Sequence, residues 1–136
     1  MPLTLVLAEQ FIAAAKQKAQ EKGWDMSFAV VDSAGNLVAL ARMDNARWLT
    51  TGVAQSKAFT AATFRRTSRE VAELAESRSQ LFSSVADIIG RPLLLAGGGL
   101  PLAASGEFLG GVGASGGTED EDIECARAAL DTIGAE

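Results

Sequence analysis

The side chains able to do chemistry are of few kinds in this sequence of 136 residues. Histidine is absent, which removes Ser-His-Asp and Cys-His catalysis, histidine-based zinc sites and the commonest haem ligand. Tyrosine is absent as well. Any chemistry therefore falls to carboxylates, a lysine, arginines, hydroxyl groups and backbone amides.

Lys57 and Arg42 are the two cations whose positions suggest a ligand site. Lys57 interrupts an alanine-rich helical stretch, so its ammonium either reaches solvent or projects into a cleft as a proton shuttle. Arg42 and Asp44 follow an expected strand and either form a surface ion pair or hold a ligand. In the second case Arg42 and Lys57 meet at one cleft mouth, where an arginine fork and a lysine charge clamp an anion.

The glycine-rich last third offers a second candidate seat for an anion. Ser115 to Gly117 precede a capping box formed by Thr118 and Glu121, so backbone N–H groups face outward at a helix start. The acidic residues 119–122 stabilise that helix start and repel an anion, which leaves turn geometry as the alternative. The triple glycine 97–99 lacks the spacing and the following helix of a phosphate loop. Gly98 and Gly99 nevertheless belong to the glycine-loop region of the candidate site.

The candidate site is therefore drawn from three parts of the chain, and no metal is assigned to it. Lys57 is its candidate catalytic residue. The candidate ligand-binding residues are Arg42, Asp44, Lys57, Gly98, Gly99, Ser115, Gly116 and Gly117.

Two further groups have a simpler structural interpretation. Glu70, Glu73 and Glu76 share one helical face, which is either a solvated acidic face or a holder for a cation. Cys125 lies among apolar residues and is expected to be a small buried hydrophobe. A single cysteine cannot form an internal disulfide, which favours a reducing, cytoplasmic location.

Bulk composition limits the partners. The net charge is −5, yet eight of the twelve basic residues lie between Arg42 and Arg91, so the middle of the chain is suited to an anion. No basic stripe with stacking aromatics indicates nucleic acid, and no apolar run reaches the ~18–20 residues that cross a bilayer. We expect a small-molecule anionic ligand, no nucleic acid and no membrane.

Periodicity and turn residues predict the elements that position these side chains. The order is α-β-β-α-α-β-β-β-α, an α/β (α+β) domain over residues 1–136 with a five-stranded antiparallel sheet. The expected helices cover 4–22, 53–64, 67–76 and the residues after 118, and the expected strands cover 26–31, 37–40, 93–96, 102–104 and 108–114.

Three stretches carry a resemblance to a known family. They are 32–37 running to 42–46, then 54–61, then 98–101 running through 110–117. Together, and in this order, they resemble the GlcG/HbpS family, whose members include a haem-binding extracytoplasmic sensor accessory and the C-terminal part of PduO-type proteins. The similarity covers nearly the whole chain.

The resemblance implies a profilin-like sheet with helices on both faces and even-numbered oligomers. It also implies haem or corrinoid as a cofactor in some members, where a histidine near the first helix is an axial ligand. This chain has no histidine, so we expect haem to bind weakly and without the spectrum of histidine ligation. The chemically able substitutes are Met26, Met43, Cys125 and Lys57.

Two functions are carried forward. The first is a small-molecule-binding protein of the GlcG/HbpS type, with an anionic metabolite or a tetrapyrrole as ligand. The second is a cofactor-free catabolic enzyme, a lyase or isomerase acting on a small carboxylate with Lys57 or a carboxylate as proton shuttle. A purely structural role is the third reading. We expect a homo-oligomer larger than a dimer, with the pocket lined from two chains.

Overall fold

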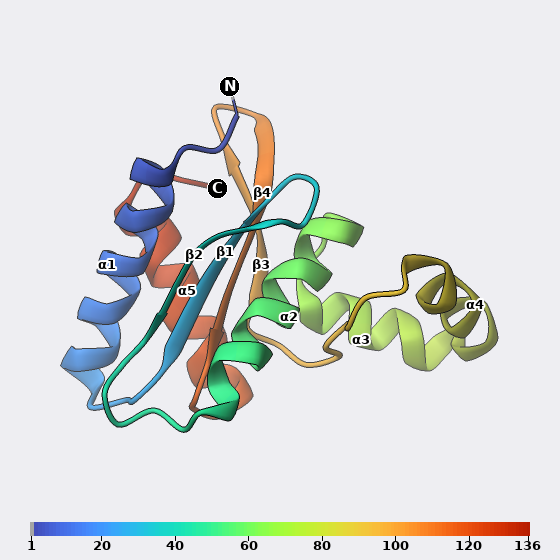
Figure 1. Cartoon of the computed structure of the whole chain (residues 1–136), viewed down its shortest axis with the longest axis horizontal. Coiled ribbons are helices and arrows are strands. Elements are labelled where there is room, and N and C mark those ends of the chain that lie inside the picture. The colour runs from blue at the N-terminus through green and yellow to red at the C-terminus, as the bar shows by residue number, and fades with distance from the viewer. Residues whose placement is uncertain (1) are drawn as a thin grey trace.

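The computed structural model describes residues 2–136. In chain order the elements are α1 (Leu5–Lys22), β1 (Ser27–Asp32), β2 (Leu37–Arg42), α2 (Leu49–Phe64), α3 (Ser68–Ser77), α4 (Ser79–Ile89), β3 (Gly99–Ala104), β4 (Glu107–Ser115) and α5 (Glu119–Thr132). The strands form one sheet in the order β2-β1-β4-β3, and every neighbouring pair is antiparallel. Helix α2 packs on one face, and α1 and α5 pack on the other (Figure 1).

Local sequence signals set the first half of the fold as predicted. Thr4 caps α1 by accepting a hydrogen bond from the backbone of Leu7, and Gly23 ends the helix in the left-handed region at φ 73°. The hairpin between β1 and β2 turns on Asp32, whose carboxylate accepts the backbone N–H groups of Ala34 and Asn36. None of the helices in the described part of the chain is long and apolar enough to cross a membrane.

Glycines of β4 allow α2 to lie directly on the sheet. A Cβ added at Gly113 would collide with the carbonyl oxygen of Ala54, and one added at Gly111 would collide with that of Ala58. The alanines of α2 are themselves buried. The glycine-studded sequence of the strand is therefore explained by close helix–sheet packing.

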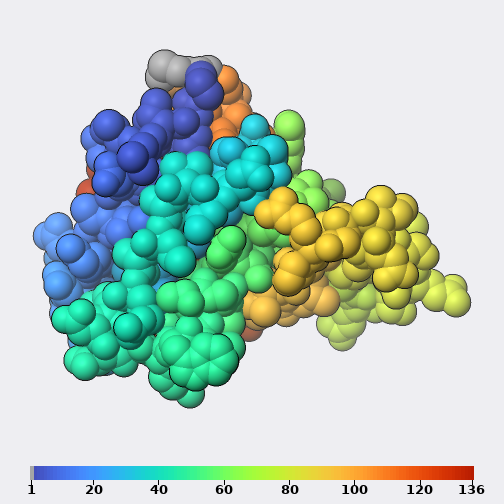
Figure 2. Space-filling model, in the orientation of Figure 1, coloured from blue at the N-terminus to red at the C-terminus, as the bar shows by residue number. Residues whose placement is uncertain are grey.

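Helices α3 and α4 form an arm that stands out from the body (Figures 1 and 2). None of the residues of α4 is buried, and Leu81 and Ile88 are 57% and 84% exposed. The ring of Phe82 stacks on that of Phe64 at the end of α2, with centroids 5.7 Å apart. Sequence analysis did not predict α4, although its apolar residues recur at helical spacing.

The prediction of five strands was wrong, because the described sheet has four. Residues 93–96 form no strand, since their backbone is bonded elsewhere: the N–H of Leu94 donates to the Thr60 hydroxyl, and the carbonyl of Ala96 accepts from Ser68. The edge strand β3 begins at Gly99, earlier than expected, and includes Pro101. Proline is tolerated there because one side of an edge strand has no ladder partner.

Candidate functional site

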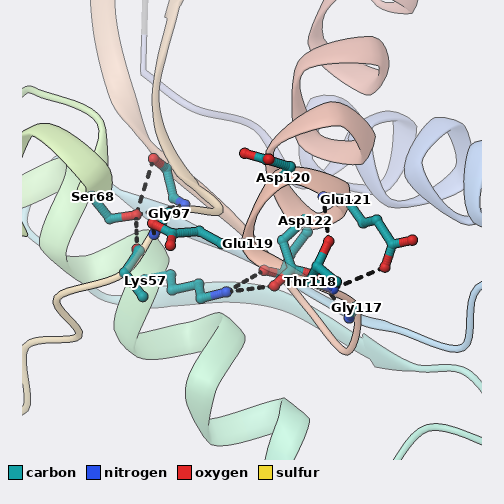
Figure 3. A network of polar contacts seen from close by, with 12 residues as sticks. Lys57, Ser68, Gly97, Gly117, Thr118, Glu119, Asp120, Glu121 and Asp122 are labelled. Atoms are coloured by element: carbon teal, nitrogen blue, oxygen red, sulfur yellow. Dashed lines mark hydrogen bonds and ion pairs between the residues drawn. The ribbon is translucent and has the colours of Figure 1, made fainter.

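Lys57 lies inside the protein and is paired with a carboxylate from the opposite face of the sheet. Its ammonium nitrogen is 2.7 Å from Oδ2 of Asp122 and donates a second hydrogen bond to the carbonyl of Ala114 at 3.1 Å (Figure 3). Both side chains are about 5% exposed or less. The ion pair thus joins α2 to the start of α5 across the end of β4.

Asp122 also holds the loop before its own helix. Its Oδ1 accepts the backbone N–H of Gly117 at 3.0 Å. Burial raises the pKa of the Asp122 carboxyl, and the hydrogen bond and charge of Lys57 oppose that shift. The pair therefore has the surroundings of a structural connection between elements.

Gly98 and Gly99 make room for this connection. A Cβ at Gly98 would lie 2.8 Å from the Lys57 ammonium nitrogen, and one at Gly99 would collide with the Lys57 carbonyl oxygen. The N–H of Gly99 donates to the Ser68 hydroxyl, which lies on α3. In the single chain these two glycines pack against α2 and α3, and the hollows described below do not include them.

The backbone donors ahead of α5 are used by the helix itself. Gly117 donates to Asp122, and Thr118 donates to Oε1 of Glu121 at 2.9 Å. Glu121 in turn donates its N–H to the Thr118 hydroxyl, which completes the predicted capping box. Of the two alternatives for this loop, turn geometry accounts for these donors, and the chain's own carboxylates occupy the place of an external anion.

Arg42 and Asp44 lie at the end of β2, beside a hollow of about 500 Å³ that we call the Arg42 hollow. Arg42 is exposed, and its Nη1 donates to the carbonyl oxygens of Ala46 at 2.9 Å and Asp44 at 3.4 Å. Of the two alternatives for Arg42 and Asp44, the ion pair between their side chains is not formed among the described residues, and the guanidinium bonds to the loop backbone instead. The hollow is lined by Lys16, Gln20, Asp25, Ala41, Arg42, Met43, Asp44 and Asn45.

A second hollow of about 290 Å³, the Gly116 hollow, adjoins the first and shares Asp25 and Asn45 with it. It lies at the end of the sheet where the loops before α2 and α5 meet. Its other lining residues are Gly23, Trp24, Ala46, Arg47, Thr50, Gly116, Gly117 and Glu121. Four of the predicted ligand residues, Arg42, Asp44, Gly116 and Gly117, therefore line two adjoining hollows. Ser115, the last residue of β4, is buried and lines neither hollow.

The structure does not bring Arg42 and Lys57 together as a clamp in the single chain. Arg42 donates to its own loop, whereas the Lys57 side chain is 5% exposed and its ammonium is bonded to Asp122 and Ala114. The clamp was predicted from the assumption that a hairpin and the next helix share one cleft mouth. That assumption failed because the partner of Lys57 comes from α5, 65 residues further along the chain.

The four side chains that could replace a histidine as haem ligand differ in how deeply they are buried. Met26, Lys57 and Cys125 are buried, and burial raises the pKa of the Cys125 thiol to about 12, so it stays protonated at neutral pH. Met43 is half-buried and lines the Arg42 hollow, where its sulfur accepts the N–H of Met26 at 3.4 Å. Met43 is therefore the one of the four that stands beside a described hollow.

Of the three glutamates on one face of α3, Glu70 takes part in capping the helix. Glu70 accepts the N–H of Thr67 in the predicted capping box, and this bond lowers the pKa of its carboxyl. Among the residues that the structure describes, no group of three or more cysteine, aspartate or glutamate side chains is placed to hold a metal ion.

The described fold and site define an α+β protein with one antiparallel sheet between helices and two adjoining hollows at one end of the sheet. The family model for the haem degrading protein HbpS-like family matches residues 3–131. The chain belongs to the HbpS-like family, and the resemblance found in the sequence is confirmed.

Individual relatives agree with this assignment. The chain is 36% identical to the protein GlcG of Escherichia coli K12 over 114 residues, which cover 83% of this chain and 81% of GlcG. The crystal structure of a doubly substituted HbpS of Streptomyces reticuli has a TM-score of 0.84 at 33% identity and covers 98% of this chain and 88% of that one. The PduOC–haem complex has a TM-score of 0.88 at 24% identity, over 100% and 98% of the two chains, and shares the fold.

Sequence reasoning missed the residues that complete the site. Lys16 and Gln20 are polar positions of α1, and the pattern gave no reason to place them beside β2. Asp122 was counted only as one of four acidic residues at a helix start. A signal was present for Lys57, because a lysine on the alanine-rich side of a helix needs a buried partner.

Proposed function

We propose that the protein binds an anionic small molecule in the Arg42 hollow, and that a carboxylated tetrapyrrole such as haem is the ligand class it takes. The observation that carries this proposal is the position of Arg42. Its guanidinium is anchored by one nitrogen to backbone carbonyls at the edge of a hollow of about 500 Å³. That volume lies within the ~300–1,000 Å³ usual for ligand sites.

Ligand binding in the Arg42 hollow depends more on the geometry of the guanidinium than on the net charge of the lining residues. Lys16 and Arg42 face Asp25 and Asp44 around the hollow, so the formal charges balance. A guanidinium fixed on one side offers its other N–H groups as a planar fork, which suits a carboxylate. The HbpS-like family name and the PduOC–haem complex support a tetrapyrrole as the source of that carboxylate.

Haem bound in this hollow would have no histidine as an axial ligand to its iron. Met43 is the soft ligand that the hollow offers to iron, while Ala41 and the stems of Lys16 and Gln20 offer apolar contact to the ring. A corrinoid is a further member of the same ligand class. Because axial ligation is weak, most of the binding free energy comes from the carboxylates and the ring face.

The proposal includes a homo-oligomer larger than a dimer. Helix α4 has 11 residues and buries none of them, although isolated helices shorter than ~12–15 residues are marginal in water. Leu81 and Ile88 give it an exposed apolar face. A second copy of the chain would cover that face and stabilise the arm, and it would complete the wall of a ligand site.

Titration with hemin and with metal-free protoporphyrin IX tests the ligand class. Since histidine is absent, both should bind with dissociation constants within about threefold of each other, and hemin should give a broad Soret band. A tight stoichiometric hemin complex with a sharp six-coordinate spectrum would show that the iron ligands have been misjudged. Binding of neither molecule at 100 µM, roughly −5.5 kcal/mol, would reject a tetrapyrrole.

A further inference from the structure

A separate polar hollow lies on the outer side of α2, and we call it the Arg91 hollow. Its volume is about 250 Å³. The lining residues are Gly52, Gln55, Ser56, Phe59, Arg91 and Pro92, so it shares none with the Arg42 hollow. The segment that follows α4 forms one wall and lies against the β1–β2 hairpin turn (yellow and cyan in Figure 2).

Arg91 is fixed in place before any ligand arrives. Its Nη2 donates to the carbonyl of Gly35 at 2.9 Å, and its guanidinium carbon lies 4.0 Å from the centroid of the Phe59 ring. Gly35 is needed for this arrangement, because it has φ 82° and an added Cβ would lie 2.6 Å from Phe59. Within residues 2–136, Nε and Nη1 of Arg91 have no hydrogen-bond partner. The turn and the ring thus hold the guanidinium in one position, with N–H groups left free for a ligand in the hollow.

Neither the packing nor the backbone conformation of the chain explains why residue 52 is a glycine. It lies inside α2, where glycine lowers helix stability relative to alanine, and its φ does not require glycine. A Cβ added there meets no atom within 4 Å. The bare backbone at Gly52 therefore leaves free space in the hollow that the fold itself does not use.

We propose that the Arg91 hollow binds a small organic carboxylate carrying a hydroxyl or carbonyl group next to the carboxylate. The carboxylate accepts from the free N–H groups of Arg91, and the neighbouring oxygen bonds to the Gln55 amide or the Ser56 hydroxyl. The body of the molecule lies over Gly52. At the ~30 Å³ that one water takes in the liquid, 250 Å³ suits a molecule of about eight non-hydrogen atoms.

The ligand class is tested by NMR titration of the ¹⁵N-labelled protein with lactate, lactamide, propionate and inorganic phosphate. Lactate should shift the Arg91 Nε–H and Gln55 side-chain signals with a dissociation constant on the order of 1 mM. Lactamide, which lacks the charge, should bind at least tenfold more weakly, and propionate, which lacks the hydroxyl group, at least threefold. Equal shifts with all four, or phosphate binding tenfold tighter than lactate, would overturn the proposal.

Gly52→Ala separates binding from folding. The variant should raise the folding equilibrium constant about fivefold through helix propensity, while the added methyl group weakens lactate binding at least tenfold. Arg91→Lys keeps the charge but loses the fork and should also weaken binding, whereas Arg127→Lys, on an exposed position of α5, should not. Unchanged lactate binding in Gly52→Ala would contradict the site. A changed molecular mass by light scattering would make the hollow an interface between copies instead and would overturn the carboxylate proposal.

The two hollows are also tested independently of each other. Arg42→Ala should leave lactate binding unchanged, and Gly52→Ala should leave protoporphyrin binding unchanged. Loss of both activities in either variant would contradict two separate sites. Failure of lactate to bind would leave the tetrapyrrole proposal standing.

Discussion

The ammonium of Lys57 and the carboxylate of Asp122 are 2.7 Å apart in the interior, although they come from helices on opposite faces of the sheet. Each has a second backbone partner, Ala114 for the lysine and Gly117 for the aspartate. The pair thereby ties α2, β4 and α5 together and is bonded to Gly117, which lines the Gly116 hollow. Its role in this fold is to position the glycine loop that forms one wall of the Gly116 hollow.

Removing one member of this pair should be costly. Lys57→Met leaves the Asp122 carboxylate buried without its cation and should lower the free energy of unfolding by about 3–5 kcal/mol. The double variant Lys57→Met/Asp122→Asn keeps an oxygen for Gly117 but removes both charges, so it should recover at least half of that loss. Urea denaturation of Lys57→Met, Asp122→Asn and the double variant measures the coupling. Strictly additive effects would mean that the two charges do not depend on each other.

The close contact between α2 and β4 predicts that substitution of Gly113 by a larger residue destabilises the fold. Gly113→Ala would bring a methyl group against the Ala54 carbonyl, so the helix must move away from the sheet. We expect a loss of roughly 1–3 kcal/mol or more, the range for overpacked cores. Gly106→Ala is the comparison variant, because nothing lies within 4 Å of its Cβ and only its φ of 78° opposes the change. Equal thermal stability of Gly113→Ala and the wild type would contradict the packing described here.

Cys125 should be unreactive in the folded protein. Its thiol is buried, donates to the carbonyl of Ala15 at 3.2 Å and has its pKa raised to about 12 by burial. Ellman's reagent at pH 8 should therefore react only at the rate of unfolding. Fast labelling under native conditions would place the thiol at the surface.

The same thiol predicts a pH dependence of stability. In the unfolded chain it ionises near its ordinary pKa of 9.0, whereas in the folded chain it stays protonated until about 12. Its contribution is therefore present below pH 9 and is lost as the pH rises from 9 toward 12, with a slope of up to ~1.4 kcal/mol per pH unit. Denaturation curves of Cys125→Ala should lack this slope. An identical slope in the variant would assign it to other groups.

The arm predicts the oligomeric state. Ile88 is 84% exposed in the single chain, so a charge there costs nothing within one protomer. If a second copy covers α4, Ile88→Glu should lower the mass measured by light scattering, and the far-ultraviolet circular dichroism should lose at most the helical signal of α4. Gln80→Glu on the same helix is the charge-matched control. A wild-type protein that stays monomeric at all concentrations would remove the oligomer from the account.

Local signals predicted much of the fold, and long-range contacts explain what they missed. The capping residues Thr4, Thr67 and Thr118 and the stop at Gly23 were readable because each acts within four residues. The apolar run 93–96 looked like a strand because composition alone does not show that Thr60 and Ser68 take its backbone groups. Strands pair through their backbone N–H and carbonyl groups. A segment whose backbone groups are bonded to distant side chains therefore cannot join the sheet, and the sequence does not show this.

In the candidate site, too, features set by local sequence could be predicted and features set by long-range contacts could not. Arg42 and Asp44 could be proposed from the sequence because charged residues at a strand end stand out, and both line a hollow in the structure. The partner of Lys57 was not found, since which of four consecutive acidic residues becomes buried is decided by how α5 docks on the sheet. The same docking also determined that Gly117 donates to a carboxylate of the chain itself.

The central claim is that Arg42 holds the carboxylate of a ligand in its hollow, and fluorescence titration of protoporphyrin IX against Arg42→Ala and Arg127→Ala tests it most directly. Both variants remove one exposed positive charge, so a general charge effect on binding cancels in the comparison. Arg42→Ala should bind protoporphyrin at least tenfold more weakly, about 1.4 kcal/mol, with little change in thermal stability, while Arg127→Ala should bind like the wild type. Equal binding by both variants would contradict the claim.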